Sequence, residues 1–255
     1  MRVVKIGGRA QGDSRLAATL RDAWNAEPGE LCVVHGGGDE VSAMQRALGR
    51  EAAFVGGRRV TSEEDLDLLR MVLSGVVNKR LVNDLVAAGL PAVGTSGEDG
   101  GLIGAELIDA ASLGFAGRPV SVKADLLRTL LKAGYLPVIS PLGYNTTSSK
   151  GGALNVNGDD AAAAIAAALG ADELLLIADV EGVRGGDGEI FSSLSIETAR
   201  DLAANGIAAG GMAAKLESAE FALRAGVGRV KITDLAGLGD DERGTFITQS
   251  QSVVL

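Results

Sequence analysis

Two glycine-rich turns each follow a short hydrophobic run. Residues 3–6 (VVKI) lead into Gly7–Gly8, and residues 31–34 (LCVV) lead into a histidine and three consecutive glycines at 36–38. A glycine turn at the end of a strand exposes backbone N–H groups that can hold the oxygens of a phosphate or carboxylate. Either turn alone is explained as well by a tight connection between a strand and a helix. Two such turns together, with Lys5 on the first strand, favour an anion-binding site.

Two lysines and one aspartate could add charge to that site. Lys5 within a buried strand needs an anionic partner, because removing an ammonium group from water is unfavourable, or it must reach solvent along its own stem. Lys215 follows a glycine pair at the start of a helix, where a solvated surface lysine is the simpler interpretation. Asp159 opens another helix and would by itself be a cap. However, Asn155, Asn157 and Asp159 alternate, so an extended backbone would turn them to the same side and form a wall for a ligand.

Arg59 lies just before the predicted N-terminus of a helix, where the helix dipole favours anions over cations. A bound anion would explain this position, because arginine binds carboxylates through two parallel hydrogen bonds. A plain surface arginine explains it equally well. His35 and Cys32 are expected to be structural, and the absence of a GxSxG motif argues against a hydrolase that uses the histidine.

The composition limits the classes of function. The chain has 255 residues, with 24 Lys and Arg against 33 Asp and Glu, which gives a net charge of −9 and argues against nucleic-acid and anionic membrane partners. A hydrophobic content of 46% and a charged content of 22% are typical of a globular soluble protein. A single cysteine excludes an internal disulfide and a zinc site built on cysteines, and a single histidine excludes any site that needs two imidazoles.

No segment of the sequence resembles a membrane span or a targeting signal. The longest apolar run, at residues 161–169, is about half the length of a spanning helix, and the first predicted strand begins at once. We therefore expect a cytoplasmic protein. The sequence also lacks the GxxxxGK[ST] loop, a GxGxxG turn after a strand, and the HRD and DFG motifs of protein kinases.

Short strands alternate with helices, which predicts an α/β fold with a parallel sheet covered on both faces. The strands are predicted at residues 3–6, 31–34, 92–93 (ending at Gly94), 136–139, 174–178 and 229–233. Helices are predicted after a capping box formed by Thr61 and Glu64, over 158–169, and along the stripe of apolar residues from 212 to 223. Alternation between 101 and 122 predicts a hairpin insertion, and a boundary between two lobes is expected near Gly170.

Several motifs, in order along nearly the whole chain, are similar to those of the amino acid kinase family, and in particular of its members that phosphorylate N-acetyl-L-glutamate. They are KIGG (5–8), VHGGG (34–38), GRRVT (57–61), MVLSGVVNK (71–79), SGEDG (96–100), GYLPV (134–138), NVNGD (155–159), DVEGV (179–183) and GGMAAK (210–215). Each motif alone is weak, whereas the ordered set is specific. The resemblance implies a three-layer αβα sandwich on a mostly parallel central sheet, as in carbamate kinase.

The resemblance also implies a division of labour and a reaction. Residues 1–170 would bind the acyl amino acid and form a dimer, and residues 171–255 would bind ATP with its magnesium ion. The γ-phosphoryl group of ATP would pass to the side-chain carboxylate of N-acetyl-L-glutamate, a step of arginine biosynthesis. No general base is required, because a carboxylate is already ionised at pH 7. No protein ligand for the metal is assigned.

The resemblance assigns roles residue by residue. Lys5 and Lys215 would stabilise the transferring phosphoryl group, and Asp159 would hold both lysines. The substrate would be bound by Gly37, Gly38, Arg59 and Asn155. The nucleotide would be bound by Gly7, Gly8, Asp179, Val180, Glu181, Gly182, Val183, Arg184, Ile207, Ala208, Ala209 and Gly210.

Some features leave alternatives open. Arg9, Ala10, Glu98 and Gly158 depart from the family pattern near the site, so the acyl group could be acetyl, succinyl or linked to a carrier. The chain starts directly on its first strand, which predicts a homodimer without arginine feedback. One alternative is a kinase for aminoadipate or glutamate attached to an acidic carrier protein, and the absence of a cluster of Lys and Arg argues against it. Another is a non-catalytic sensor of the same fold.

Overall fold

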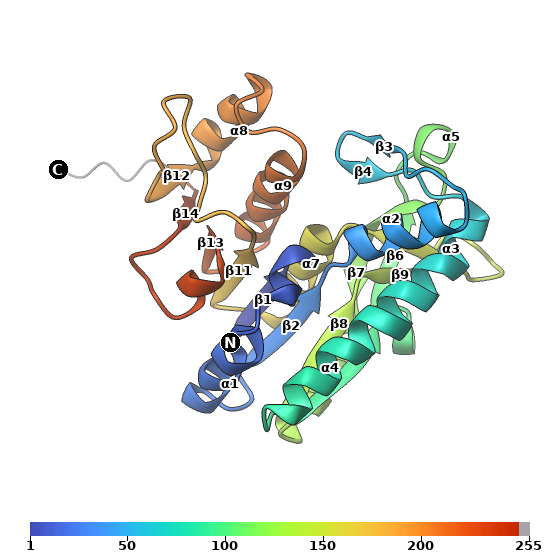
Figure 1. Ribbon diagram of the computed structural model, residues 1–255, viewed down its shortest axis with the longest axis horizontal. Coiled ribbons are helices and arrows are strands. Elements are labelled where there is room, and N and C mark those ends of the chain that lie inside the picture. Colours follow the sequence, from blue (N-terminus) through green and yellow to red (C-terminus); the bar gives the residue numbers. More distant parts are fainter. Residues whose placement is uncertain (250–255) are drawn as a thin grey trace.

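A central sheet of eight strands organises the protein, which is a computed structural model describing residues 1–249. Across the sheet the strand order is β12-β14-β13-β11-β1-β2-β8-β5 (Figure 1). Neighbouring strands are parallel except β13 and β14, so the predicted α/β class with a mostly parallel sheet is confirmed. The strands are β1 (Arg2–Ile6), β2 (Leu31–His35), β5 (Ala92–Ser96), β8 (Leu136–Ser140), β11 (Glu173–Ile177), β12 (Ser193–Ser195), β13 (Arg229–Thr233) and β14 (Thr245–Thr248).

Helices cover both faces of this sheet. One face packs against α7 (Gly158–Leu169) and α9 (Gly211–Arg224), with α8 (Ile196–Ala204) beside α9 and β12. The opposite face packs against α1 (Leu16–Ala26), α4 (Asn78–Ala87) and the short turn η4 (Leu235–Leu238), and α6 (Asp125–Lys132) packs against β8. Because helices bury both faces of the sheet, the inner strands are hydrophobic at nearly every position and do not alternate with polar residues.

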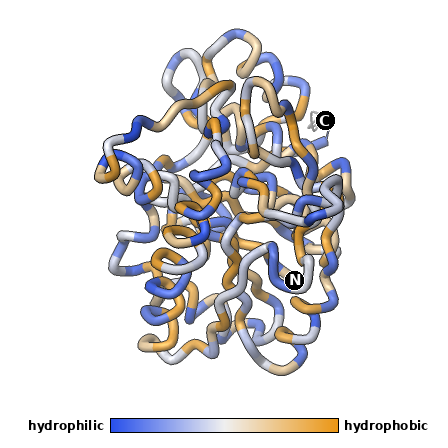
Figure 2. The backbone as a smooth tube through the Cα atoms, turned by 90° about the vertical axis from the view of Figure 1, so that its right-hand side faces the viewer, coloured by the Kyte–Doolittle hydropathy of each residue, from blue (hydrophilic) through white to orange (hydrophobic). Residues whose placement is uncertain are grey.

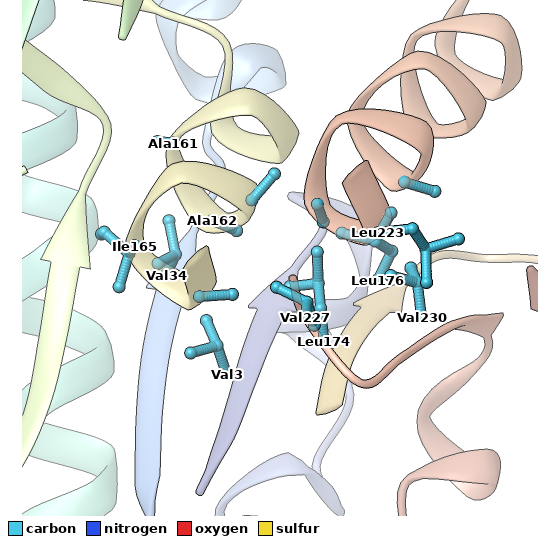
Figure 3. Packing of buried hydrophobic residues seen from close by; sticks show 14 of the residues in the cluster. Val3, Val34, Ala161, Ala162, Ile165, Leu174, Leu176, Leu223, Val227 and Val230 are labelled. Carbon is cyan, nitrogen blue, oxygen red and sulfur yellow. The ribbon is translucent and has the colours of Figure 1, made fainter. Parts of the chain in front are cut away.

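Successive residues of a strand pack alternately against the helices on one face of the sheet and against those on the other. Val3 packs in the cluster beneath α7 and α9, while its neighbour Val4 packs in the cluster beneath α1 and α4. Figure 3 shows the first cluster, with Ala161 and Ile165 of α7 lying over Val34. In Figure 2 the hydrophobic segments run through the interior and the most hydrophilic ones lie mainly in outer loops.

A small closed barrel lies beside the sheet. The strand order around the barrel is β10-β7-β6-β9. Its strands are β6 (Ile103–Leu107), β7 (Ala116–Val122), β9 (Leu142–Asn145) and β10 (Ala153–Val156), and α5 (Ala110–Leu113) connects β6 to β7. Because β6 and β7 are antiparallel, the predicted hairpin over 101–122 is confirmed.

The remaining elements lie between these strands and the glycine turns. They are η1 (Arg9–Gly12), α2 (Gly38–Ala47), β3 (Phe54–Val55), β4 (Arg58–Arg59), α3 (Glu63–Leu69), the π-helix η2 (Arg70–Val77) and η3 (Asp99–Gly101). Strands β3 and β4 form a two-stranded hairpin. Within residues 1–249, none of the helices combines the length and the apolar character needed to cross a lipid bilayer.

The predicted capping box is wrong by one residue. Ser62, not Thr61, caps α3: its Oγ accepts a hydrogen bond from the N–H of Asp65 (3.2 Å), and the Asp65 carboxylate accepts one from the N–H of Ser62 (3.1 Å). The hydroxyl of Thr61 is already used, because it donates to the carbonyl of Arg59 (3.1 Å) and accepts from Asn155 Nδ2 (2.9 Å).

Two other boundaries show why glycines are present. The strand expected to end at Gly94 continues to Ser96, and a Cβ at Gly94 would lie 2.0 Å from Asn78 Oδ1, so this glycine allows close packing rather than a turn. Gly170 ends α7 in the left-handed conformation (φ 67°), as expected for a helix C-terminus. The next strand, β11, joins the same sheet beside β1, so one sheet runs through both predicted lobes.

Candidate active site

Lys5, Asp159 and Lys215 meet at the carboxyl edge of the central sheet. Lys5 Nζ lies 2.8 Å from Asp159 Oδ1, and Lys215 Nζ lies 3.0 Å from Asp159 Oδ2. The three side chains come from β1, α7 and α9, and their exposed fractions are 8%, 6% and 13%. The solvated surface lysine considered for Lys215 is therefore wrong.

This cluster carries one more positive charge than negative charge in a nearly dry place. Burial alone would raise the pKa of Asp159, but the ammonium groups of Lys5 and Lys215 more than offset it, so the pKa lies below its ordinary value. Burial lowers the pKa of Lys215, and repulsion from Lys5 adds to this, while Asp159 opposes both. An excess of buried ammonium groups is stabilised when an anion binds beside them.

Asp159 is free to bind the lysines because another residue caps its helix. Asn157 Oδ1 accepts hydrogen bonds from the N–H groups of Asp159 (2.8 Å) and Asp160 (3.4 Å). The helix begins at Gly158, so the extended alternation of Asn155, Asn157 and Asp159 stops before the aspartate. The cap interpretation of Asp159 is thus wrong, and its carboxylate is turned to the sheet edge.

The two glycine turns touch each other beside this cluster. Each continues the ladder of the sheet, since Gly7 donates to the carbonyl of Ile177 (3.0 Å) and Gly36 donates to that of Ile6 (2.8 Å). A Cβ on Gly36 would lie 3.3 Å from the backbone nitrogen of Gly8, so larger residues would push the turns apart. Helix α2 begins at Gly38, which leaves the N–H groups of its first turn without intrahelical acceptors.

A cavity of about 560 Å³ opens beside the lysines. It is lined by Lys5, Gly7, Gly8, Arg9, Ala10, Gly38, Asp39, Ala178, Asp179, Val180, Gly211, Met212 and Lys215. Four of the residues predicted to bind nucleotide are in this lining, namely Gly7, Gly8, Asp179 and Val180. Arg9, which also lines this cavity, pairs with Asp179 at 2.6 Å.

The other predicted nucleotide residues lie outside this lining. Glu181 pairs with Arg243 at 2.5 Å beside a separate hollow. The segment after it makes internal contacts: Gly182 packs against Thr245, which accepts a hydrogen bond from Val183, and Arg184 donates to the Gly188 carbonyl. In the second predicted segment Ala208 is buried and Ile207 is 47% exposed, and Ala209 and Gly210 enter α9. Their role with the nucleotide stays a prediction.

A second, smaller cavity of about 150 Å³ holds the four residues predicted to bind the acyl amino acid. Gly37, Gly38, Arg59 and Asn155 all line it, and its apolar lining includes Val41, Phe54, Leu69, Leu73, Ile108 and Val156. Gly38 belongs to both cavities, so the two meet at the second glycine turn.

Arg59 brings a nearly buried positive charge to the smaller cavity. It is 8% exposed, and it donates to Gln45 Oε1 (2.5 Å), the Gly38 carbonyl (2.8 Å) and Ser42 Oγ (2.8 Å). Its guanidinium also lies 4.8 Å from the centre of the Phe54 ring. Burial lowers the pKa of Arg59, and the more distant Asp65 and Asp39 oppose this shift. These direct partners are neutral, which suits a bound carboxylate.

His35 and Cys32 are structural, as predicted. Both are fully buried, and burial lowers the pKa of His35 to about 4, so its imidazole is neutral at pH 7. Asn78 holds the ring from the side opposite Gly36.

The structure adds residues that the sequence did not single out. Asp39 and Met212 line the larger cavity, and Arg58 lines the smaller one. The only signal for them was position, since each is close to a predicted site residue in sequence. Within the described residues no group of three or more His, Cys, Asp and Glu side chains could hold a metal ion on its own.

Comparison with known proteins places this site in a family context. The model of the amino acid kinase family matches residues 1–234. An acetylglutamate kinase of Ruegeria pomeroyi is 44% identical over 235 residues, 91% of this chain and 80% of the relative. That of Methanopyrus kandleri is 42% identical over 256 residues, 97% of this chain and all of the relative. The structure of smu.665 from Streptococcus mutans UA159 superposes with a TM-score of 0.88 at 28% identity and covers 98% of both chains.

Proposed function

The chain belongs to the amino acid kinase family, and on that premise we propose that it transfers the γ-phosphoryl group of ATP to the side-chain carboxylate of N-acetyl-L-glutamate. Relatives that are 42% and 44% identical over most of the chain are acetylglutamate kinases. The observation that carries the proposal is the cluster of Lys5, Asp159 and Lys215, whose two lysines line the larger of two cavities that meet at Gly38. The product would serve arginine biosynthesis.

The larger cavity fits the polyphosphate of ATP. Two buried ammonium groups face it with only one carboxylate between them, and the glycine turn at Gly7 and Gly8 leaves its backbone open to the cavity. ATP would supply the phosphoryl group. Magnesium usually binds through phosphates and one or two carboxylates, and Asp39 and Asp179 are the carboxylates in this lining.

The smaller cavity fits an acyl amino acid. Arg59, with neutral direct partners, would bind the α-carboxylate together with Asn155, whose amide already donates to Thr61. The apolar lining suits a short acyl group and the aliphatic part of the side chain. The reacting carboxylate would then lie beside the turn at Gly37 and Gly38, where the two cavities meet.

The chain's own groups supply positioning and charge. Lys5 and Lys215 would neutralise negative charge that builds up on the transferring group. Asp159 keeps both ammonium groups in place through its two ion pairs. The acceptor is an anion at neutral pH, so proton abstraction is unnecessary. This agrees with a site in which the only histidine is neutral and buried under the second turn.

We further propose a cytoplasmic homodimer in which residues 1–170 carry the acyl amino acid site and the remainder carries most of the nucleotide site. ATP and a free acyl amino acid are cytoplasmic metabolites. Met71 and Val76 on η2 are 60% and 53% exposed, which makes this helix one apolar surface available to a second copy.

The alternatives lack a supporting observation. A kinase for a carrier-linked substrate should offer free basic residues around the site, but Arg58 pairs with Asp160, and Arg80 pairs with Glu40. A sensor would not need two lysines held by one buried aspartate. Neither is proposed.

The test is ATP- and magnesium-dependent formation of an acyl phosphate, trapped as the hydroxamate. N-acetyl-L-glutamate would be compared with N-succinyl-glutamate, free glutamate and N-acetyl-aminoadipate. We expect turnover with the first substrate and its loss in Lys5→Ala, with Lys150→Ala in an exposed loop as the control. Absence of turnover with all four substrates, or equal turnover in Lys5→Ala, would contradict the proposal.

A further inference from the structure

The β3–β4 hairpin carries two consecutive arginines, Arg58 and Arg59, whose guanidinium groups bond to different helices. Successive side chains of a strand point to opposite sides. Arg59 points to α2, where it contacts Gly38 and Ser42 at the smaller cavity. Arg58 also borders the smaller cavity, but its guanidinium pairs with acidic residues of α7 and α9.

Arg58 joins the hairpin to both of those helices. Its Nη1 donates to Asp160 Oδ2 on α7, and its Nη2 lies 3.8 Å from Glu217 Oε2 on α9. The second oxygen of Asp160 accepts a hydrogen bond from Ser218 Oγ of α9 at 2.7 Å. The Arg58 and Asp160 side chains are 23% and 15% exposed, so water screens this pair less than a surface pair.

These contacts lie directly beside the catalytic cluster in the chain. Asp160 follows Asp159, and Ser218 is one turn of helix after Lys215. The hairpin backbone also reaches α9, because a Cβ on Gly57 would lie 3.3 Å from the carbonyl oxygen of Gly210. The hairpin that carries Arg59 is therefore held in place by α7 and α9, the helices that carry Asp159 and Lys215.

We propose that Arg58 is a positioning residue that acts through a hairpin latch, defined as Arg58, Asp160 and Ser218. The latch keeps the hairpin against α7 and α9 and thereby keeps Arg59 at the cavity for the acyl amino acid. It also links occupancy of that cavity to the helix that carries Lys215. The inference rests on the proposed function for its kinetic consequence, and its structural consequence can be measured without turnover.

The kinetic test compares Arg58→Ala, Arg58→Lys, Asp160→Asn and the double variant Arg58→Ala/Asp160→Asn. In Arg58→Ala we expect KM for N-acetyl-L-glutamate to rise about tenfold, equivalent to about 1.4 kcal/mol, because the hairpin must be ordered again on binding. KM for ATP should change by less than about twofold, since Arg58 is not in the larger cavity. Arg58→Lys should recover part of the loss, and the double variant should resemble Arg58→Ala rather than combine both losses.

The structural test is amide hydrogen exchange of residues 54–59 in the ligand-free protein. Exchange should be faster in Arg58→Ala and in Asp160→Asn than in the parent chain. The control is Arg118→Ala, which removes a more exposed ion pair with Glu106 between β6 and β7 and should change neither exchange in the hairpin nor KM. Asp160→Asn keeps the side-chain shape, so it reports on the latch if Arg58→Ala folds poorly.

Unchanged exchange in the hairpin of both single variants would overturn the latch. Faster exchange with an unchanged KM for the acyl amino acid would overturn the positioning role, as would additive effects in the double variant. If the parent chain phosphorylates none of the tested acids, the proposed function fails. In that case the exchange measurement still decides whether the latch exists.

Discussion

His35 allows a quantitative prediction about acid stability. Its ring is fully buried under the second glycine turn, and both ring nitrogens are engaged. Nδ1 lies 2.7 Å from the carbonyl oxygen of Gly36, and only a protonated Nδ1 can donate to it. Nε2 lies 3.1 Å from the amide nitrogen of Asn78, a donor, so Nε2 must be unprotonated to accept. A second proton would place two donors against each other in a dry site.

The sign and size of the effect follow from this geometry. Burial lowers the pKa of His35 from 6.5 to about 4. Between these values the unfolded chain binds a proton that the folded chain does not, so the stability contribution is complete above about pH 6.5 and is lost as the pH falls to about 4. A separation of about 2.5 pH units at about 1.36 kcal/mol per unit gives roughly 3 kcal/mol. Below about pH 4 the folded chain also takes the proton, and the effect levels off.

The assay is urea unfolding of the parent chain and of His35→Gln at several pH values from 4 to 8. Carboxylates titrate in both proteins and cancel in the difference between the two curves. Because the chain has one histidine, the difference reports on His35 alone. We expect the advantage of the parent chain over the variant to shrink by roughly 3 kcal/mol from pH 7 to pH 4. Parallel curves over this range would refute the argument from burial and hydrogen bonding.

Two further predictions concern the lysine cluster and the second glycine turn. Lys215→Ala should lower kcat by roughly 10²- to 10³-fold in the hydroxamate assay, because one preorganised charge is lost while Lys5 still holds Asp159. A decrease in kcat that is smaller than about tenfold would contradict this role of Lys215. Gly37→Ala should lower the free energy of unfolding by about 1–3 kcal/mol in urea, since its φ is +151° and a Cβ would lie 2.7 Å from Leu73 Cδ2. Gly49→Ala, also at positive φ (+73°) but without neighbours within 4 Å, is the control, and an equal loss there would show that crowding at Gly37 contributes nothing.

Local sequence patterns predicted the elements whose limits are set by local chemistry. The predicted helix over 158–169 matches α7, because a capping residue precedes it and Gly170 follows it. Strand β13 (Arg229–Thr233) also has the predicted limits, since a segment rich in β-branched residues there ends at an aspartate. The same logic failed at Thr61, where a contact with Asn155, distant in the chain, decided which hydroxyl capped the helix.

Long-range arrangement was beyond local patterns. Nothing near residue 5 indicates that its partner is Asp159, and only the ordered family motifs connected the two. Closure of the barrel depends on the pairing of β7 with β10, which are separated in sequence by α6, β8 and β9. Arg58 and Arg59 are the same residue type in adjacent positions, so sequence alone could not show that the guanidinium of Arg59 bonds to α2 while that of Arg58 bonds to α7 and α9.

The site combines three nearly buried cations, Lys5, Lys215 and Arg59, with one carboxylate in direct contact, Asp159. Such an arrangement is less stable than a site with matched charges, because each uncompensated cation has lost part of its hydration. The imbalance is distributed over both cavities: Arg59 faces the smaller one, and the two lysines face the larger one. Two anionic ligands, one in each cavity and meeting at Gly38, would together neutralise this excess of positive charge. The folded chain is thus already arranged for the charge that two bound anions bring, which is the electrostatic requirement of phosphoryl transfer between them.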